Sequence, residues 1–254
     1  MTAKTVMRIN DISTLLYAAE FTSKDWGHVW WRGQADSRWC LQPRVSRSTT
    51  LEAVERSLAR EFQAKAHTRY ANCPDQDDYP GWLFLMQHYG LPTRLLDWSE
   101  SPLVALFFAV REMQADCGAL FALTPLGLNE NQLHKPGLVP PHGSRIDQLV
   151  EPVFDERLSF SPSIVAVATK EIDNRMLIQQ SQFTFHGSDM PLDQVTQEET
   201  FLVRFDVPSA AKTKIWQELA LLGIRESTLF PDLEHLAREL TVKYDYGVYG
   251  VNPS

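Results

Sequence analysis

Cysteine is scarce in this chain of 254 residues, and long apolar runs are missing. Cys40, Cys73 and Cys117 are odd in number and widely spaced, so they fit neither a disulfide framework nor a zinc site. No stretch is long and apolar enough to span a bilayer, and residues 1–10 lack the apolar core of a signal peptide. These absences predict a protein that works in a reducing cytoplasm and has no membrane partner.

The sequence also lacks the motifs of several large enzyme classes. It has no Walker A loop, no Gly-x-Gly-x-x-Gly fingerprint and no His-Glu-x-x-His helix. No ligand spacing surrounds His134 and His142, so no metal is expected. The formal net charge of -8 argues against strong non-specific binding to nucleic acid or anionic membranes, although a local basic cleft is compatible with it.

The residues that are present have an ordinary globular balance. Hydrophobic residues make up 44% and charged residues 22%, which is enough apolar surface for a sizeable core. No internal repeat is visible, so residues 1–254 are expected to form a single domain. Strand and helix patterns interleave, and most strands alternate or are short. We therefore predict an α+β fold with a mixed or antiparallel sheet flanked by helices.

The expected elements follow from hydrophobic periodicity and from capping residues. Strands are predicted at 28–34, 93–98, 117–124, 163–169, 183–187 and 201–207, and helices at 9–21, 51–69, 82–89, 209–222 and 231–240. Residues 174–180 are expected to be extended or a helical turn, and residues 224–230 a short strand or turn. Residues 127–160 give no clear pattern, and residues 243–254 are expected to form a loose terminus.

One stretch, residues 87–109, combines a bend, a short strand and the start of an apolar helix. Ser99 is a good N-cap for that helix, and Pro102 suits its first turn. Arg94, Asp97, Ser99 and Ser101 therefore gather at a strand-to-helix junction, where free N–H groups can hold an anion such as a phosphate. The alternative is that Arg94 and Asp97 pair with each other to stabilise a buried turn.

A second group of polar residues surrounds an aromatic strand near the N-terminus. Arg32 follows two tryptophans, so its guanidinium is expected to stack on a ring or to point into a cleft. Arg44 and Arg47 begin a basic cluster further along the chain. His88 lies next to the bend of the central stretch, where it serves either as a satisfied structural residue or as a ligand.

Three stretches of the chain together resemble the FRG domain family, which is named after a Phe-Arg-Gly tripeptide. Here Trp31 stands where the family has Phe, in the sequence Trp31-Arg32-Gly33-Gln34. The longest similarity is the run 87–109, and weaker similarities lie at 174–184 and 223–233. The resemblance covers about residues 30–240 and implies one FRG-type domain with a core at about 28–240. It implies little chemistry.

A more distant resemblance is to ADP-ribosyltransferases of the Arg-Ser-Glu type. Arg32 matches the Arg that holds the NAD phosphates, and Ser99 or Ser101 matches the Ser that shapes the nicotinamide pocket. Glu226 is the best match for the Glu that stabilises the ribosyl cation, with Asp97 and Glu100 as alternatives. The chain lacks the family's Glu-x-Glu, because Ile224 stands two residues before Glu226, and Glu100 replaces the usual Thr. Transfer to arginine is therefore less expected than transfer in general.

The chemistry of NAD cleavage sets out which residue types such a site needs. Positive charge develops on the ribose, so a nearby carboxylate lowers the barrier, while arginines hold the diphosphate and aromatic rings stack on the nicotinamide. The resemblance and this chemistry together suggest a catalytic set of Glu226, Arg32 and Ser99. The residues expected to bind NAD are Arg32, Gly33, Arg94, Ser99, Ser101, Trp31, Tyr89, His88 and Phe183. The alternative for Trp31, Trp98 and Phe183 is plain core packing. For Arg32 it is pairing with an acid, and for Glu226 it is an exposed charge in a loop or at a helix start.

These observations favour an NAD-dependent ADP-ribosyltransferase-like enzyme that modifies a cytoplasmic macromolecule, either protein or nucleic acid. The resemblance suggests a bacterial toxin or an anti-phage defence effector, with an antitoxin protein among its partners. One alternative is a non-catalytic FRG module that senses a nucleotide or a partner protein. Another is a nucleic-acid-processing enzyme that uses Arg44, Arg47, His88 and Asp97. The leading hypothesis predicts that Arg32, Arg94 and Ser99 line one cleft.

Overall fold

The strands of the molecule form one mixed sheet. The computed structural model describes residues 5–112, 114–169 and 173–246. Within these ranges a sheet of seven strands has the order β1-β7-β4-β2-β3-β6-β5. β1 is parallel to β7, and every other neighbouring pair is antiparallel. The strands are β1 (Thr5–Arg8), β2 (Trp30–Gln34), β3 (Leu95–Ser99), β4 (Gly118–Leu123), β5 (Ile164–Val167), β6 (Ser181–His186) and β7 (Leu202–Val207). The predicted α+β class and single sheet are confirmed.

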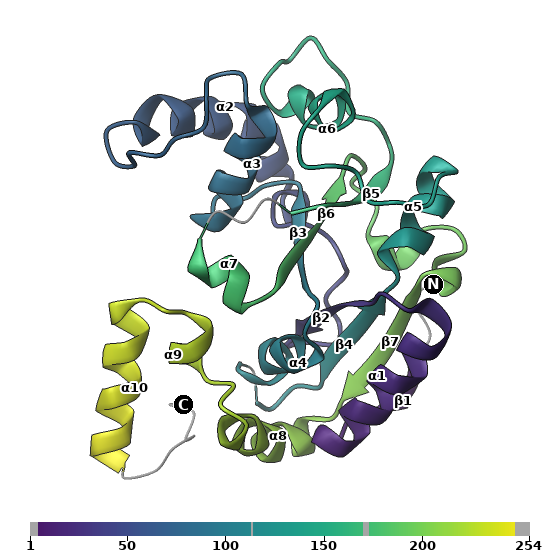
Figure 1. Cartoon of the computed structure of the whole chain (residues 1–254), viewed down its shortest axis with the longest axis vertical. Helices are drawn as coiled ribbons and strands as arrows, with labels where there is room; N and C mark the ends of the chain where they lie inside the picture. Colours follow the sequence, from purple (N-terminus) through teal and green to yellow (C-terminus); the bar gives the residue numbers. More distant parts are fainter. Residues whose placement is uncertain (1–4, 113, 170–172, 247–254) are drawn as a thin grey trace.

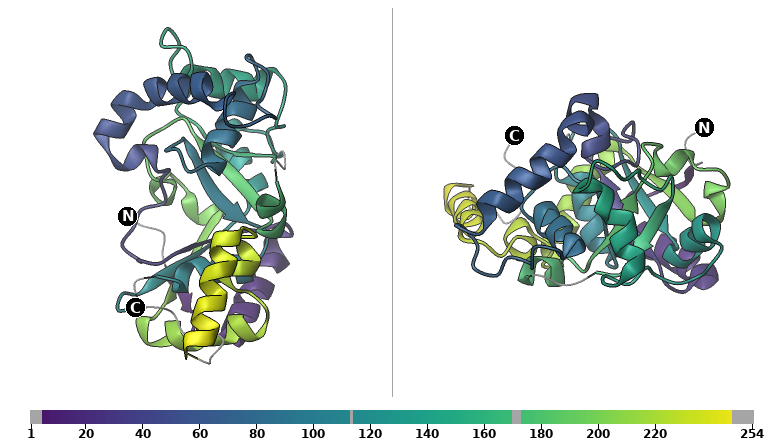
Figure 2. Two further views of the ribbon diagram at one scale, coloured as in Figure 1. Left: turned by 90° about the vertical axis from the view of Figure 1, so that its left-hand side faces the viewer. Right: turned by 90° about the horizontal axis from the view of Figure 1, so that it is seen from above.

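Two groups of helices cover different halves of this sheet (Figures 1 and 2). The helices α1 (Ile12–Trp26), α4 (Pro102–Val110) and α8 (Ser209–Leu221) pack beside β7, β4 and β2. The helices α2 (Thr49–Ala66), α3 (Tyr79–His88) and α6 (Ser144–Val150) pack over β3, β6 and β5. The remaining α-helices are α5 (Pro125–Leu133), α7 (Asn174–Ile178), α9 (Glu226–Leu229) and α10 (Leu233–Tyr246). No helix in the described ranges is long and apolar enough to cross a membrane.

β4 lies near the centre of the sheet and is buried on both of its faces. Leu120 and Ala122 belong to the cluster under α4 and α8, whereas Phe121 packs on the opposite face with Trp30 and other side chains. A strand that is covered on both sides carries a continuous apolar run rather than an alternation. This burial explains why the sequence from Gly118 to Leu123 is apolar throughout.

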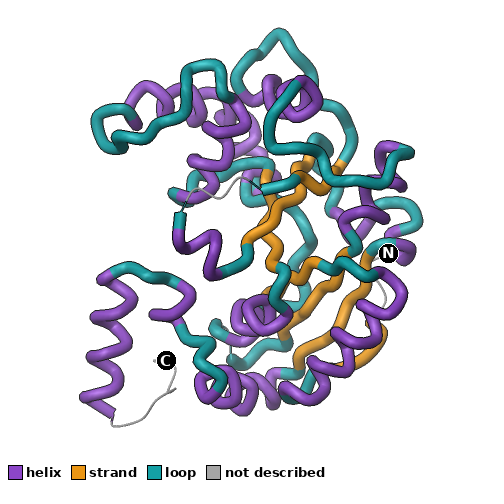
Figure 3. Tube along the Cα trace, viewed as in Figure 1, coloured by secondary structure: helices purple, strands orange, loops and turns teal. Residues whose placement is uncertain are grey.

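The sheet splits between β2 and β3, and this split creates the cleft described below. β2 pairs with β4 at five positions but with β3 at only one, where Trp31 faces Ser99. On its other side β3 is fully paired with β6. The two central strands therefore meet at one end and diverge at the other, which leaves backbone groups of β3 available to side chains. Figure 3 shows the strands of the sheet in orange among the helices.

Gly33 fixes how closely β2 can approach α4. A Cβ atom at this position would lie 1.9 Å from the carbonyl oxygen of Ala105 and 2.7 Å from the backbone nitrogen of Ala109. Both of these are backbone atoms of a buried helix, so neither can move aside easily. The Gly of the Arg-Gly pair is therefore required for packing, and it holds Arg32 at the split.

We expect Gly33→Ala to destabilise the fold by about 3 kcal/mol, because the added methyl group overpacks a contact between two backbones. Chemical denaturation of the purified variant measures this loss. Gly223→Ala is the matched control: it adds the same methyl group where no atom lies within 4 Å and φ is +82°, so its cost is limited to about 1 kcal/mol for a left-handed backbone. Equal stabilities of the two variants would contradict the packing role of Gly33.

The structure corrects several local expectations. Ser101, not Ser99, is the N-cap of α4, because the side chain of Ser101 accepts the N–H of Val104. Residues 224–230 form no strand. They contain the short helix α9, whose start is stabilised by a hydrogen bond from the Arg225 N–H to the Thr228 hydroxyl.

Some regions held more structure than the sequence indicated. Residues 127–160 contain most of α5 and all of α6, and residues 5–8 form β1, which periodicity did not reveal. Of the two options for residues 174–180, the structure has the helical turn, α7. α10 extends to Tyr246, and the rest of the expected loose terminus lies outside the described residues.

Candidate functional site

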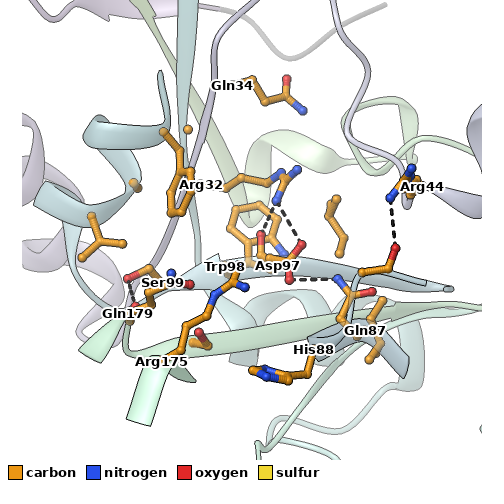
Figure 4. A pocket seen from close by; sticks show the side chains of 18 of the residues that line it. Arg32, Gln34, Arg44, Gln87, His88, Asp97, Trp98, Ser99, Arg175 and Gln179 are labelled. Atoms are coloured by element: carbon orange, nitrogen blue, oxygen red, sulfur yellow. Dashed lines mark hydrogen bonds and ion pairs between the residues drawn. The ribbon is translucent and has the colours of Figure 1, made fainter. Parts of the chain in front are cut away.

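A cleft of about 910 Å³ opens where β2 and β3 diverge. Its lining comes from both strands, from the bend after α3, from the η1 turn (Val45–Arg47), from α4 and from α7. Figure 4 shows Arg32 and Asp97 facing each other in the middle of this cleft, with Gln87 and Ser99 on either side of them. The volume falls within the range of sites that hold small molecules and cofactors.

Arg32 reaches from β2 across the split to β3. Its Nη1 donates a hydrogen bond of 2.6 Å to the carbonyl oxygen of Asp97, a group that the diverging strands leave unpaired with β2. The side chain is only 16% exposed, and its Nε–H is buried with no hydrogen-bond partner among the described residues. Burial lowers the pKa of Arg32 to about 10, with Asp97 opposing and Arg47 adding to the shift, so the guanidinium stays charged at neutral pH.

Asp97 presents the central carboxylate of the cleft. Its side chain is 58% exposed, and its Oδ2 lies 3.9 Å from Nη1 of Arg32. The Nε2 of Gln87 donates a hydrogen bond of 2.9 Å to Oδ1, and the Gln87 side chain is itself held by the Thr93 hydroxyl. The carboxylate is therefore fixed in direction on a rigid strand and still open to a ligand.

Positive charge outweighs negative charge along the cleft, although the whole chain is acidic. Five arginines line it, namely Arg32, Arg44, Arg47, Arg111 and Arg175, against the four carboxylates Asp97, Glu112, Asp173 and Asp232. Arg44 is anchored by a hydrogen bond of 3.0 Å to the carbonyl oxygen of Gly90. Burial lowers the pKa of Arg47, with Arg44 adding to the shift and Asp97 opposing it. The site is suited to an anionic ligand.

Aromatic rings form the apolar part of the lining. Tyr89 is 57% exposed at the bend after α3, and Trp39 is also exposed. Trp31 is buried and stacks on Phe205 at 6.1 Å, so it belongs to the core as well as to the floor of the cleft. The exposed rings are the ones available to stack on a planar ligand.

Ser99 lies at the single point where β2 and β3 pair, and its hydroxyl is already engaged. It donates a hydrogen bond of 2.7 Å to the carbonyl oxygen of Gln179 and accepts one of 3.0 Å from the N–H of Ser101. Gln179 in turn donates to the carbonyl oxygen of Leu229 in α9. The predicted serine therefore lines the cleft, but its hydroxyl joins the end of β3 to Gln179 after α7, and the Gln179 side chain extends this link to α9.

We expect Ser99→Ala to cost about 2 kcal/mol of unfolding free energy, because it leaves a buried carbonyl and a backbone N–H without their shared partner. Thermal unfolding of the variant measures the loss. Ser23→Ala on the exposed surface of α1 is the control and should change little. A Ser99→Ala protein as stable as the wild type would contradict this bridging role.

Arg94 does not line the cleft, which overturns one part of the sequence-based prediction. Its guanidinium is buried, with Nε 2.9 Å from the Glu55 carboxylate and Nη1 3.2 Å from Asp189. The ring of Phe160 lies 3.7 Å from the guanidinium carbon. The suggested pairing of Arg94 with Asp97 is also wrong, because Asp97 faces Arg32 and Arg94 packs against α2.

Three other predicted site residues lie outside the cleft lining. Glu226, at the start of α9, pairs with Arg238 at 3.5 Å and with His235 at 3.8 Å. Phe183 is buried in the core against Phe84, with ring centroids 5.5 Å apart. Ser101 is occupied as the N-cap of α4. The structure does bring together the remaining predicted residues, which are Trp31, Arg32, Gly33, His88, Tyr89 and Ser99.

Sequence reasoning missed several residues of the cleft. Gln87 holds Asp97, and Arg175 stacks over Phe230 at 4.6 Å. Gln34 is buried, and its Oε1 has no hydrogen-bond partner in the described part of the chain. Gln87 begins the stretch 87–109, and Gln34 ends the Trp31-Arg32-Gly33-Gln34 motif. Their positions in these two motifs could have identified them as residues of the cleft. In the described ranges, no group of three or more His, Cys, Asp or Glu side chains is arranged to hold a metal ion.

Comparison with known families bears on the part of the chain that builds this cleft. Residues 27–117 match the model of the FRG domain. No curated protein and no solved structure matches the chain. The matched part contains β2, β3 and α4, and with them Arg32, Gly33, Asp97 and Ser99. An FRG domain is therefore identified at residues 27–117.

Proposed function

We propose that this cleft binds NAD and that the protein transfers ADP-ribose from NAD to an acceptor. The observation that carries the proposal is the pair formed by Arg32 and Asp97. A buried guanidinium with an unbonded Nε–H faces a fixed, exposed carboxylate in a single cleft. Such a pair offers one group for a diphosphate and one for a developing cation, which are the two needs of NAD cleavage.

Arg32 is the proposed diphosphate ligand. A buried donor without a partner is costly, and a phosphate oxygen bound there would remove that cost. Burial also strengthens the attraction between the guanidinium and an anion, because little water screens it. Arg47, whose charge acts on both Arg32 and Asp97, adds positive charge at the same end of the cleft.

Asp97 is the proposed acid that stabilises the transition state, in place of Glu226. The bond between C1′ of the ribose and the nicotinamide nitrogen breaks, and its electron pair leaves with neutral nicotinamide. The cation that remains on the ribose is stabilised by the carboxylate until an acceptor forms a new bond to C1′ and loses a proton. Glu100 fits less well, because its Oε1 accepts a hydrogen bond from Gln182 and it does not line the cleft.

The exposed rings of Tyr89 and Trp39 are the proposed stacking partners for the planar groups of NAD. Together with the two polar groups they supply an anion site, an acid and a flat apolar surface. A sensor that binds NAD without cleaving it would use the arginine and the rings but would not need a free carboxylate. The fixed and open carboxylate of Asp97 therefore favours an enzyme.

The test is incubation of the purified protein with labelled NAD and a bacterial lysate. Label that enters protein or nucleic acid, measured separately, supports transfer and identifies the class of acceptor. Arg157→Ala is the matched control, because Arg157 is an arginine that is 85% exposed and does not line the cleft. Nicotinamide release and labelling should be lost in Arg32→Ala and kept in Arg157→Ala. Binding of NAD without nicotinamide release would instead support the sensor.

A toxin or defence role is a further part of the proposal, and it predicts a phenotype. Expression of the wild-type protein in bacteria should arrest growth, and expression of Asp97→Asn at the same level should not. Equal growth of the two strains would contradict the toxin role. The labelling assay would then still test the transferase activity separately.

One observation favours a second candidate, a nucleic-acid-processing enzyme. Arg44, Arg47, His88 and Asp97 all line the same cleft. Basic side chains beside a histidine and a carboxylate suit a phosphodiester substrate. Cleavage of RNA or DNA by the purified protein without NAD would favour this candidate over the transferase.

A further inference from the structure

His88 lies in the cleft at the end of α3, and no step of the proposed NAD cleavage uses it. Its side chain is 15% exposed, and its Nε2 is 2.8 Å from Oδ2 of Asp173. The other oxygen of Asp173 accepts the N–H of Met176 and thereby caps α7. Because Asp173 is fixed as the N-cap of α7, its carboxylate is held beside the His88 imidazole. Figure 4 shows His88 below Gln87 in the cleft.

This contact determines which ring nitrogen of His88 carries the proton. A carboxylate next to Nε2 favours a proton on that nitrogen, so the lone pair of the neutral ring is on Nδ1. Among residues 5–112, 114–169 and 173–246, the polar contact of the His88 ring is the one from Nε2 to Asp173, and none involves Nδ1. His88 thus has the arrangement of a general base that is oriented by a third group.

Burial, rather than the charged neighbours, favours the neutral ring of His88. Burial lowers the pKa of His88, Arg175 of α7 adds to this shift, and Asp173 opposes it. The other titratable neighbours are Tyr89, whose ring is 4.8 Å from that of His88, and Tyr70 and Cys73, which act on Tyr89. A neutral imidazole is the form that accepts a proton.

We propose that His88 is the general base that takes the proton of the acceptor, that Asp173 is its positioning residue, and that the acceptor is a hydroxyl group. This inference rests on the proposed ADP-ribosyl transfer. The acceptor oxygen forms a bond to C1′ of the ribose, and its proton moves to Nδ1 of His88. The bond from C1′ to nicotinamide breaks, and nicotinamide leaves with the electron pair.

The pairing of the cleft carboxylates favours a hydroxyl over a guanidinium acceptor. A guanidinium is held by carboxylates, and the four in the lining are already paired: Asp97 with Arg32, Glu112 with Arg111, Asp173 with His88 and Asp232 with His235. A carboxylate acceptor is already deprotonated and needs no base. A hydroxyl is neutral and is a poor nucleophile until a base removes its proton. His88 is placed to act as that base.

The test compares two small acceptor probes, methanol and agmatine, at saturating NAD. The wild type should form methyl ADP-ribose and little of the agmatine adduct. His88→Gln should lower methanol transfer by about 10²-fold and Asp173→Asn by less, since general-base catalysis is commonly worth 10²–10⁴-fold.

The pH dependence of the rate is a second readout. The wild-type rate should fall as the pH drops below the usual histidine pKa, and this acid limb of the pH profile should vanish in His88→Gln. His142→Gln, an exposed histidine outside the cleft, is the control.

A measurement on the wild-type protein alone guards against misfolding of the variants. NMR of ¹⁵N-labelled histidine should show His88 neutral at neutral pH with its proton on Nε2. A proton on Nδ1, a dominant agmatine adduct or an unchanged acid limb in folded His88→Gln would each overturn the role of His88. Absence of nicotinamide release by the wild type would overturn the proposed transfer and this role with it, whereas intact release with any of those three results overturns the role alone.

Discussion

Asp97→Asn should lower the release of nicotinamide from NAD by about 10²–10³-fold, while NAD still binds. Asparagine has the size of aspartate, and its amide oxygen can still accept the hydrogen bond from Gln87. The substitution therefore removes the negative charge and little else. A charge that acts only when the ribose becomes cationic contributes to the transition state and not to the bound substrate. The assay is nicotinamide release at saturating NAD, beside a calorimetric NAD titration of the same protein.

Glu226→Gln is the matched control for this result. It makes the same chemical change at the acid that the sequence favoured, which the structure pairs with Arg238 and His235 outside the cleft. Turnover of Glu226→Gln should equal that of the wild type. If Glu226→Gln lost activity and Asp97→Asn kept it, the assignment of the acid to Asp97 would be wrong.

The second large effect is on stability. Arg94→Leu should lower the free energy of unfolding by about 3–5 kcal/mol, because it leaves the carboxylate of Glu55 buried without its partner. Burial raises the pKa of Glu55 and Arg94 opposes that rise, so the loss of Arg94 makes the charged form of Glu55 still less favourable. Guanidinium chloride denaturation measures the difference.

Arg157→Leu is the control for that experiment, because Arg157 and Asp155 form an ion pair in which the arginine is 85% exposed. Exposed pairs are screened by water and contribute little, so this variant should unfold like the wild type. Folded Arg94→Leu protein should still bind NAD. A stable Arg94→Leu protein that no longer bound NAD would contradict the structural role of Arg94 and would indicate that Arg94 binds NAD.

Local sequence patterns predicted the type of most elements, because hydrophobic periodicity reflects whether a segment is a helix or a strand. They did not predict which elements are neighbours in the sheet. The apolar runs of β4 and α4 and the alternation of β7 predicted those elements well. β1 escaped detection because its four residues are too few to show a period. Residues 224–230 were expected to be a short strand or turn, but side-chain capping within the segment favours the helix α9.

The candidate site was predictable only in part, because its geometry depends on contacts between distant segments. Arg32 and Ser99 were found from their motifs, and the pairing of β2 with β3 brings them together. Nothing in the local sequence shows that Glu55, 39 residues earlier, takes Arg94 out of the cleft. Nor does it show that β2 and β3 diverge and thereby open a place for Asp97.

The central claim is that Arg32 holds the anionic part of NAD, and a calorimetric titration of NAD into wild-type protein and Arg32→Lys tests it most directly. An ammonium keeps the charge of Arg32 but cannot make the two parallel hydrogen bonds of a guanidinium. The wild type should bind NAD, and Arg32→Lys should bind at least about 10-fold more weakly, a difference of roughly 1.4 kcal/mol, with an unchanged melting temperature. No heat of NAD binding to the wild type, or equal affinity in the two proteins, would contradict the account.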